Sequence, residues 1–398
     1  MFKTLLGAVG TAIIMGAAIV APSQADAQNR IKIGLITTLS GPNAVLGREI
    51  VDGFALGVRH SDGRLGGIET EVVQGDDQFR PDTGRELAQR MVERDRVDIV
   101  TGVVFSNILL AVADPVLRAR SNPFVISANA GPSEFAGADC NPNFFVASWP
   151  NDGTHEAAGQ HAQNAGIRRV YLMAPNYPAG RDALAGFKRF FRGEVVGEVY
   201  TQLGQTDYAA ELAALRAARP DATYIFYPGG MGVAYIRQYS QLGLIQQIPL
   251  IAPSFSADQT ILPGVGEAAL GVFASTFWSE SLDNPANRRF VTDFEAAYNR
   301  IPSPYAAQAY DTARLIDSAV RAVNGNVANR DGLRAAIRAA NFQSVRGPFR
   351  FNRNQFPIQN YYLTQIERDA RGRLVMAMRG TIFENRGDAY VEQCRMPG

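Results

Sequence analysis

The chain has 398 residues, of which 46% are hydrophobic and 19% charged, with 39 basic and 38 acidic side chains. This near-neutral balance argues against a nucleic-acid-binding surface and against a strongly acidic partner. The length favours two globular units of ~150 residues each, with extra segments, over a single domain.

Residues 1–27 have the pattern of a cleavable export signal. An apolar stretch, Leu5 to Val20, follows a basic residue and ends in the small-residue cleavage pattern Ala25-Asp26-Ala27. The stretch is too short for a comfortable membrane span, and a lipid anchor would need a cysteine at the cleavage point. Because the only cysteines are Cys140 and Cys394, we expect a soluble protein in a bacterial periplasm.

The first part of the mature chain alternates strands with helices. In the first helix Leu46, Ile50, Phe54 and Val58 recur every four residues and form one apolar face. This alternation is typical of a parallel sheet. The predicted strands are 31–36, 97–103 and 123–126, and the predicted helices are 42–60, 81–93 and 106–118.

The same alternation restarts after Trp149, which indicates a second, similar lobe. The segment 144–148 is the first candidate crossing between the lobes. The predicted strands here are 170–174, 222–227 and 249–252, and the predicted helices are 181–191, 208–218 and 232–242.

The C-terminal third first returns to the first lobe as long helices and then forms strands joined by turns. The helices have no strands of their own to cover, which places them on the first lobe. The fold class is therefore α/β with two Rossmann-like lobes. We assign residues 28–148 plus 279–351 to lobe 1 and 149–278 plus 352–398 to lobe 2. The predicted helices are 284–299 and 305–323, and the predicted strands are 271–278, 349–352, 361–366 and 374–378.

In an oxidising compartment, two cysteines favour one structural disulfide between Cys140 and Cys394. Two unpaired buried thiols are the alternative, because sequence alone does not show that the sulfurs meet. The histidines are His60, His155 and His161, and none has metal-ligand spacing to a cysteine. We expect no metal and no cofactor.

Seven stretches, in order along the chain, match one known family: IKIGLITTLSGPNAVLG, GDDQFRP, TGVVFSN, ISANAGPSEF, PNYPAGRD, YPGGMGVAYIRQ and AYDTARL. They resemble the type I periplasmic binding proteins of ABC importers, specifically the branched-chain amino acid (Leu/Ile/Val) group. The segments PNYPAGRD, PGGMG and SVRGPFRFNRNQFPIQ also resemble the subgroup that takes aromatic carboxylates such as benzoate and hydroxybenzoate.

The resemblance implies two lobes joined by a three-stranded hinge, a ligand between them, no catalysis, and delivery to permease and ATPase subunits at the inner membrane. A monomer is the default expectation. In the family a serine and backbone N–H groups at two turns hold the ligand carboxylate. Ser106, preceded by Phe105, matches that serine, and Ala128, Asn129 and Gly131 lie along the second turn. Unpaired N–H groups at helix N-termini suit an anion, although Ser106 could instead only cap its helix.

Three residues of the second lobe are further candidate ligand contacts. Tyr177 matches a ligand-contacting tyrosine of the family, or packs under the loop at Pro178. Arg181 either pairs with the carboxylate or lies on the solvated surface, and Met231 belongs to the PGGMG stretch.

The acid that counters a ligand ammonium in family amino-acid binders aligns with Ser254, with Phe255 beside it. The nearest carboxylate is Asp258, four residues further along. A buried ammonium without an anion is strongly disfavoured, which weakens the amino-acid interpretation. Aromatic residues instead gather near the predicted cleft: Phe105, Tyr177, Phe226, Tyr227, Phe255, Phe277 and Trp278.

The sequence does not favour an enzymatic function. The chain has no dinucleotide-binding or nucleophile-elbow glycine pattern, and Asp76 and Asp77, as sequence neighbours on a strand end, favour turn capping over a catalytic pair. The leading hypothesis is capture of a small aromatic carboxylate of the benzoate, hydroxybenzoate or phenylpropenoid type between two closing lobes. The alternatives are a branched-chain amino acid or amide binder that uses Asp258, and a ligand-sensing module without transport.

Overall fold

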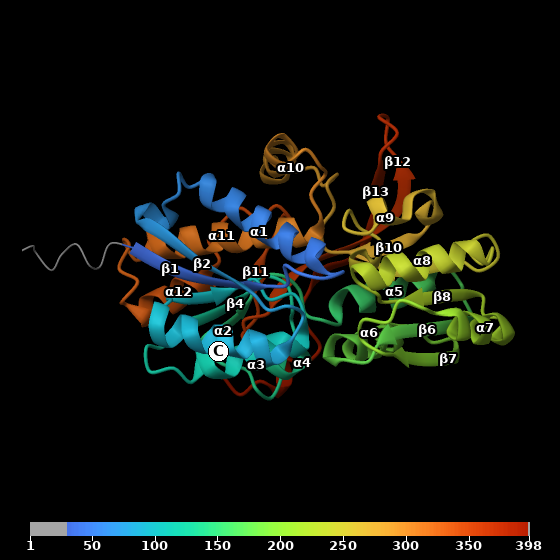
Figure 1. Ribbon diagram of the computed structural model, residues 1–398, viewed down its shortest axis with the longest axis horizontal. Helices are drawn as coiled ribbons and strands as arrows, with labels where there is room; N and C mark the ends of the chain where they lie inside the picture. The colour runs from blue at the N-terminus through green and yellow to red at the C-terminus, as the bar shows by residue number, and fades with distance from the viewer. Residues whose placement is uncertain (1–29, 397–398) are drawn as a thin grey trace, which may run out of the picture.

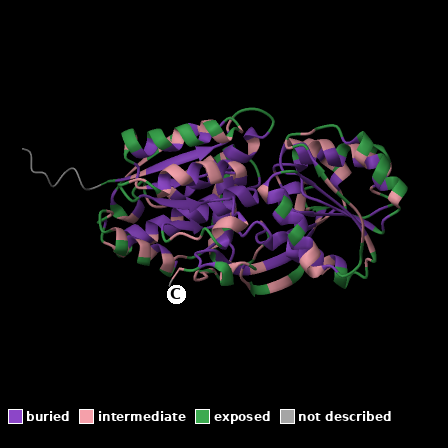
Figure 2. Ribbon diagram, turned by 90° about the horizontal axis from the view of Figure 1, so that it is seen from below, coloured by how far each residue is buried: buried purple, intermediate pink, exposed green. Residues whose placement is uncertain are grey.

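The computed structural model describes residues 30–396, which form two lobes around two separate sheets (Figure 1). The strands and the inward faces of the helices are buried, and the outer helix faces are exposed (Figure 2). The predicted export signal lies outside the described residues. No helix within residues 30–396 is both long and apolar enough to cross a bilayer.

Lobe 1 is built on a five-stranded, fully parallel sheet in the order β2-β1-β3-β4-β5. Its central strands are short and almost wholly apolar, as expected of a parallel sheet covered on both faces. The strands are β1 (Arg30–Thr37), β2 (Glu69–Asp76), β3 (Ile99–Thr101), β4 (Phe124–Ser127) and β5 (Phe144–Val146). The helices and short turns between them are α1 (Ala44–Arg59), η2 (Leu65–Gly67), α2 (Pro81–Arg90), η3 (Met91–Asp95), α3 (Ser106–Leu117) and α4 (Ser133–Ala136).

Lobe 2 is built on an eight-stranded mixed sheet, β11-β12-β10-β9-β8-β6-β7, with β13 paired to β12. Its strands are β6 (Arg169–Pro175), β7 (Glu194–Thr201), β8 (Ala222–Ile225), β9 (Leu250–Pro253), β10 (Phe273–Thr276), β11 (Arg350–Phe351), β12 (Pro357–Arg368) and β13 (Leu374–Arg386). Its helices and short turns are α5 (Gly153–Asn164), α6 (Pro178–Phe190), α7 (Ala209–Ala218), α8 (Gly230–Gln241), η4 (Ser254–Ser256), α9 (Leu262–Val265), η5 (Gly266–Ala269) and η6 (Val391–Gln393).

Three late helices, α10 (Pro285–Tyr298), α11 (Pro304–Ala322) and α12 (Arg330–Ala339), pack with the first lobe. In Figure 1, α11 lies beside α1 although the two are distant in sequence. Their backbones meet closely because Gly53 of α1 lies against Ala306 of α11, where a Cβ would stand 2.1 Å from the Ala306 carbonyl oxygen. The domain boundaries given above stay a prediction.

The boundary between the lobes differs from the expected three-stranded hinge. The chain crosses through the irregular segments 147–152 and 277–284 and along the antiparallel pair β12 and β13. The first segment contains Pro150, which has no N–H to donate to a sheet ladder. The second is rich in serine and acidic residues. Only β12 and β13 are therefore strands at this boundary in the described part of the chain.

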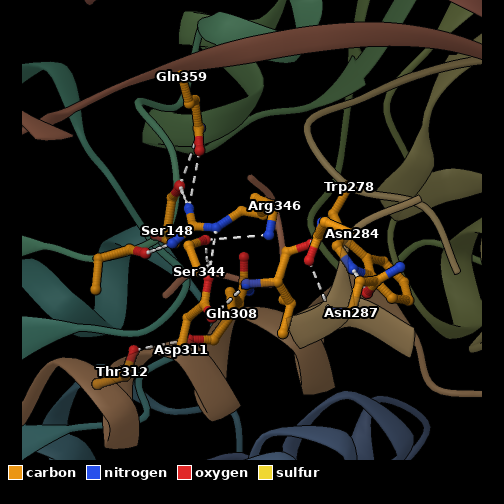
Figure 3. Close-up of polar contacts among 12 residues, drawn as sticks. Ser148, Trp278, Asn284, Asn287, Gln308, Asp311, Thr312, Ser344, Arg346 and Gln359 are labelled. Carbon is orange, nitrogen blue, oxygen red and sulfur yellow. Dashed lines mark hydrogen bonds and ion pairs between the residues drawn. The ribbon is translucent and has the colours of Figure 1, made fainter. Parts of the chain in front are cut away.

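A fully buried arginine joins the segments that meet at the boundary (Figure 3). Arg346 donates through Nε to Asp311 Oδ2 of α11 at 2.9 Å, and through Nη1 and Nη2 to the backbone carbonyls of Ser148 and Ala147 at 2.6 Å. Nη1 also donates to Gln359 Oε1 of β12 at 2.8 Å. One guanidinium thus binds lobe 1, the first crossing and the first part of β12.

The structure confirms the disulfide, with the Cα atoms of Cys140 and Cys394 5.6 Å apart. The bridge ties the C-terminal segment to the loop after α4, next to the first lobe. The two cysteines are 254 residues apart in sequence, so the bridge removes much chain entropy from the unfolded state.

We predict that replacing both cysteines, Cys140→Ser with Cys394→Ser, lowers the free energy of unfolding by about 4–5 kcal/mol because the unfolded chain gains conformational freedom. Urea unfolding monitored by circular dichroism measures this loss. A reducing agent should destabilise the wild-type protein and leave the double variant unchanged. Equal unfolding midpoints for the two proteins under oxidising conditions would contradict the prediction.

Candidate functional site

A partly enclosed cavity lies between the lobes and has room for about one water molecule, about 10 Å³. This is far smaller than an ordinary small-molecule pocket, so the wall must open to admit a ligand. Residues of both lobes, of the first crossing and of α11 contribute to its wall: Val104, Phe105, Ser106, Asn129, Ala130, Trp149, Asn151, Tyr177, Ala179, Phe226, Pro228, Phe255 and Tyr305.

Two helices, α3 of lobe 1 and α6 of lobe 2, begin at this cavity. Ser106 is the first residue of α3, and Ala179 belongs to the first turn of α6. Neither N-terminus has a side-chain cap, so its first N–H groups lack intrahelical partners and carry partial positive charge. The structure therefore shows Ser106 inside the helix and not as its N-cap. Both lobes present donors to an anion in the cavity.

Asn151 orients the Ser106 hydroxyl by a hydrogen bond. The Gly131 N–H donates to Asn151 Oδ1 at 2.9 Å, which orients the amide so that Nδ2 donates to Ser106 Oγ at 2.9 Å. Ser106 is 1% exposed. A hydroxyl that accepts one hydrogen bond still has its own O–H to donate. The Ser106 O–H therefore remains available to a ligand oxygen.

The second predicted turn contributes less than expected. Asn129 lines the cavity, but its Nδ2 donates to the Val104 carbonyl at 2.6 Å and its Oδ1 accepts from Gln308. The Gly131 N–H is engaged by Asn151. Ala128 is buried beside Asn129 and lies outside the cavity wall. This turn shapes the wall and holds Asn151.

Six aromatic side chains make most of the apolar wall. Trp149 and Phe255 pack with ring centroids 4.3 Å apart, and Tyr305 meets the edge of Phe255 at 5.2 Å. Tyr177 and Phe226 lie nearly parallel, 17° apart in plane, with centroids 6.3 Å apart. Phe105 is the sixth. Such walls offer both faces and edges to a flat ligand.

The cavity wall holds no Asp, Glu, Lys or Arg side chain among its described residues. It does hold polar atoms without partners within residues 30–396. The indole Nε1 of Trp149 is buried and donates to no protein atom. Burial raises the pKa of Tyr177 and of Tyr305, so both hydroxyls stay neutral donors at neutral pH. A ligand anion would meet dipoles and hydroxyls rather than a countercharge.

Three other predicted contacts lie outside the cavity wall. Arg181 is exposed and donates to Asn176 Oδ1 at 3.1 Å. The Met231 sulfur accepts from the Gly204 N–H at 3.3 Å. Ser254 is fully buried, and its Oγ has no hydrogen-bond partner within the described residues.

Some of the aromatic residues predicted near the cleft line the cavity, and others do not. Phe226 reaches the cavity, whereas Tyr227 points to the far side of the strand end and packs against Tyr208 and Tyr235. Only Phe226 of this adjacent pair therefore lines the cavity. Phe277 packs behind Phe255, and Trp278 packs on Phe290 of α10. These last rings belong to the core.

Asp258 does not reach the cavity wall either. Its Oδ1 accepts from the Thr260 N–H at 2.8 Å and from the Thr260 hydroxyl, and its Oδ2 has no partner within residues 30–396. Burial raises the pKa of Asp258 to about 7. A carboxyl that is half protonated at neutral pH is a weak partner for an ammonium. Asp76 and Asp77 do cap turns, accepting from the N–H groups of Gln78 and Phe79.

The PGGMG stretch acts through its backbone. Gly229 precedes α8 with a φ of 60°, where a Cβ would stand 2.7 Å from Asn43 Oδ1 of the other lobe. A Cβ at Gly230 would likewise stand 3.1 Å from the Pro42 Cβ. The two glycines let the loop of lobe 2 meet the turn that opens α1, so that the lobes can close.

Trp149, Asn151 and Tyr305 are cavity residues that the sequence reasoning did not assign. Trp149 and Asn151 belong to the first crossing, and Tyr305 opens α11. A crossing segment between two lobes necessarily lies at the floor of the cleft between them. The position of Trp149 beside the predicted crossing was therefore a usable signal.

Comparisons with known proteins agree with this architecture. The family described as "Periplasmic binding protein" matches residues 30–372. "Leu/Ile/Val-binding protein homolog 6" of Brucella melitensis is 28% identical over 372 residues, covering 90% of this chain and 93% of the relative.

Two solved structures of solute-binding proteins of ABC transporters are also similar. One, from R. palustris in complex with benzoate, is 32% identical with a TM-score of 0.86, covering 92% of this chain and all of that one. The other, from Rhodopseudomonas palustris BisB5 in complex with 3,4-dihydroxybenzoic acid, is 28% identical with a TM-score of 0.85, covering 91% and 99%. The chain therefore belongs to the periplasmic binding protein family and is an ABC-type solute-binding protein, not an enzyme.

Proposed function

We propose that this protein captures a small aromatic carboxylate of the benzoate or hydroxybenzoate type between its two lobes. The observation that carries the proposal is the cavity itself. Six aromatic rings, the unpaired Trp149 indole N–H and the free Ser106 O–H surround it, and its described lining residues include no charged side chain. The carboxylate would lie at the N-terminus of α3 and accept from the Ser106 hydroxyl. The ring would lie among Trp149, Tyr177 and Phe226.

The energetics of such a ligand are consistent with this cavity. A carboxylate taken out of water costs several kcal/mol unless hydrogen bonds replace its hydration. Each donor to a charged group contributes about 1.5–3 kcal/mol, so two or three donors roughly offset that cost. Burial of ~150 Å² of aromatic ring adds about 4 kcal/mol. The ring must therefore supply much of the affinity.

The names of similar proteins support two different ligands. The two similar solute-binding proteins were solved in complex with benzoate and 3,4-dihydroxybenzoic acid, whereas the relative from Brucella melitensis is named for Leu, Ile and Val. A zwitterionic amino acid needs an anion for its ammonium group, and the described residues of the cavity wall include no Asp or Glu. The geometry therefore favours the aromatic acid.

The proposed protein works in the periplasm after removal of its export signal, as a monomer. It would deliver its ligand to permease subunits at the inner membrane, whose transport is driven by ATPase subunits. A module that senses the same ligand and reports to a signalling protein is the alternative. Neighbouring permease and ATPase genes favour transport, and a neighbouring kinase gene favours sensing.

A thermal-shift panel tests the ligand class directly. Benzoate and 4-hydroxybenzoate are expected to raise the melting temperature of the purified protein, because a ligand that binds only the folded state stabilises it. Leucine and valine are expected to leave the melting temperature unchanged. Stabilisation by leucine or valine with none by the benzoates would overturn the assignment.

Removal of the Ser106 hydroxyl should weaken benzoate binding by ~1–3 kcal/mol, because one donor to the carboxylate is lost. Isothermal titration calorimetry of Ser106→Ala measures the change. Ser318→Ala, on the outer part of α11, where Oγ donates to the Leu315 carbonyl, is the matched control and should bind as the wild type does. Wild-type affinity in Ser106→Ala would remove this residue from the site.

The Asp258→Asn variant distinguishes an aromatic-acid binder from an amino-acid binder, and it should change how the stability of the protein depends on pH. Burial raises the pKa of Asp258 to about 7, so the folded state binds this proton more tightly than the unfolded state does. The wild-type protein therefore loses stability, by an amount on the order of a few kcal/mol, as the pH rises from about 4 to about 7.

The Asp258→Asn variant lacks that titration and keeps the Oδ1 acceptor. It should melt at a higher temperature than the wild type at pH 8 and show little difference at pH 4. Its benzoate affinity should equal that of the wild type. An identical pH dependence in both proteins, or a large loss of affinity in the variant, would contradict this account of Asp258.

A further inference from the structure

A buried contact outside the cavity wall joins the two lobes. Asp182 of α6 is 8% exposed and faces Ser133, the first residue of α4 in lobe 1. Ser133 donates to it twice, from Oγ to Oδ1 at 2.7 Å and from the backbone N–H to Oδ2 at 3.3 Å. In Figure 1, α4 and α6 lie on opposite sides of the lobe boundary.

The same carboxylate connects to the serine at the cavity. Asn151 Nδ2 donates to Asp182 Oδ2 at 3.0 Å and to Ser106 Oγ at 2.9 Å. The amide group has two N–H bonds, so it can make both contacts at once. The Gly131 N–H holds the other end of the amide. Ser106, Asn151 and Asp182 therefore form one chain of hydrogen bonds across the lobe boundary.

We propose that Asp182 is a closure residue that stabilises the closed arrangement of the lobes and, through Asn151, positions the Ser106 hydroxyl. If the lobes separate, the Ser133 contact breaks and the Asp182 carboxylate returns to water. Asn151 then loses the acceptor that fixes one of its N–H bonds. The role of Ser106 toward the ligand rests on the proposed function, whereas the role of Asp182 in closure does not.

The surface ion pairs of lobe 2 differ from this contact. Lys188 of α6 pairs with Glu198 at 2.7 Å, with side chains 39% and 29% exposed, and ion pairs in contact with solvent contribute little. The hydrogen bonds of Asp182 are buried, so loss of one of them within the closed arrangement leaves the carboxylate short of partners. Glu198→Gln is therefore a matched control for Asp182→Asn, because both convert a carboxylate to an amide within the same lobe.

Spin labels on one exposed position of each lobe, Gln89→Cys in α2 and Ala217→Cys in α7, report the distance between the lobes. In the ligand-free protein, Asp182→Asn should shift the distance distribution toward longer separations, and Glu198→Gln and Ser106→Ala should leave it unchanged. Ser133→Ala removes the hydroxyl partner of the same contact and should shift it in the same direction. If circular dichroism shows that Asp182→Asn does not fold, Ser133→Ala alone tests the closure role.

Benzoate titrations of the same variants test the link to the cavity. The Kd should rise at least tenfold in Asp182→Asn. The effects of Ser106→Ala and Asp182→Asn should be less than additive in the double variant, because the two residues act through Asn151. If Asp182 had a purely structural role, the losses of binding free energy in the two single variants would add up in the double variant. That result would overturn the positioning role.

Unchanged distance distributions in both Asp182→Asn and Ser133→Ala would overturn the closure role, whatever the affinity. Because these distances are measured without ligand, absence of benzoate binding to the wild-type protein would refute the proposed function and leave the closure test intact.

Discussion

The arrangement of the two lobes depends on one buried guanidinium at their boundary. Arg346 contacts Asp311 of lobe 1, the carbonyls of the first crossing and Gln359 of β12 (Figure 3). A buried ion pair need not add net stability, but removal of either partner leaves an unpaired charge in the interior. Because the first crossing also carries Trp149 and Asn151, the same anchor sets the position of the cavity floor.

The second constraint is electrostatic. Charged side chains are common at the surface, yet the two that follow the cavity residues Tyr177 and Ala179 in α6 are engaged elsewhere: Asp182 binds Ser133 and Asn151, and Arg181 binds Asn176. The cavity therefore offers N–H and O–H dipoles to an anion and aromatic faces to its body. Preorganised dipoles can replace the hydration of one carboxylate, whereas an ammonium group would meet no Asp or Glu among the wall residues that the structure describes.

Much of the fold follows from local sequence, because apolar runs and four-residue periodicity report burial directly. The edge strands β2 and β7 were not predicted, because polar residues and a glycine interrupt their apolar pattern, and pairing with β1 and β6 makes them strands. At the site, Ser106 and the aromatic residues Phe105, Tyr177, Phe226 and Phe255 could be found from motifs. Asn151 could not, because its role depends on three contacts made by distant segments.

A crystal structure of the protein grown with benzoate tests the central claim most directly. We predict that the carboxylate lies within hydrogen-bond distance of Ser106 Oγ at the start of α3, with the ring between Trp149 and the Tyr177–Phe226 pair. A ligand bound with a positive group against Asp258, or one whose carboxylate pairs with Arg181, would contradict the claim.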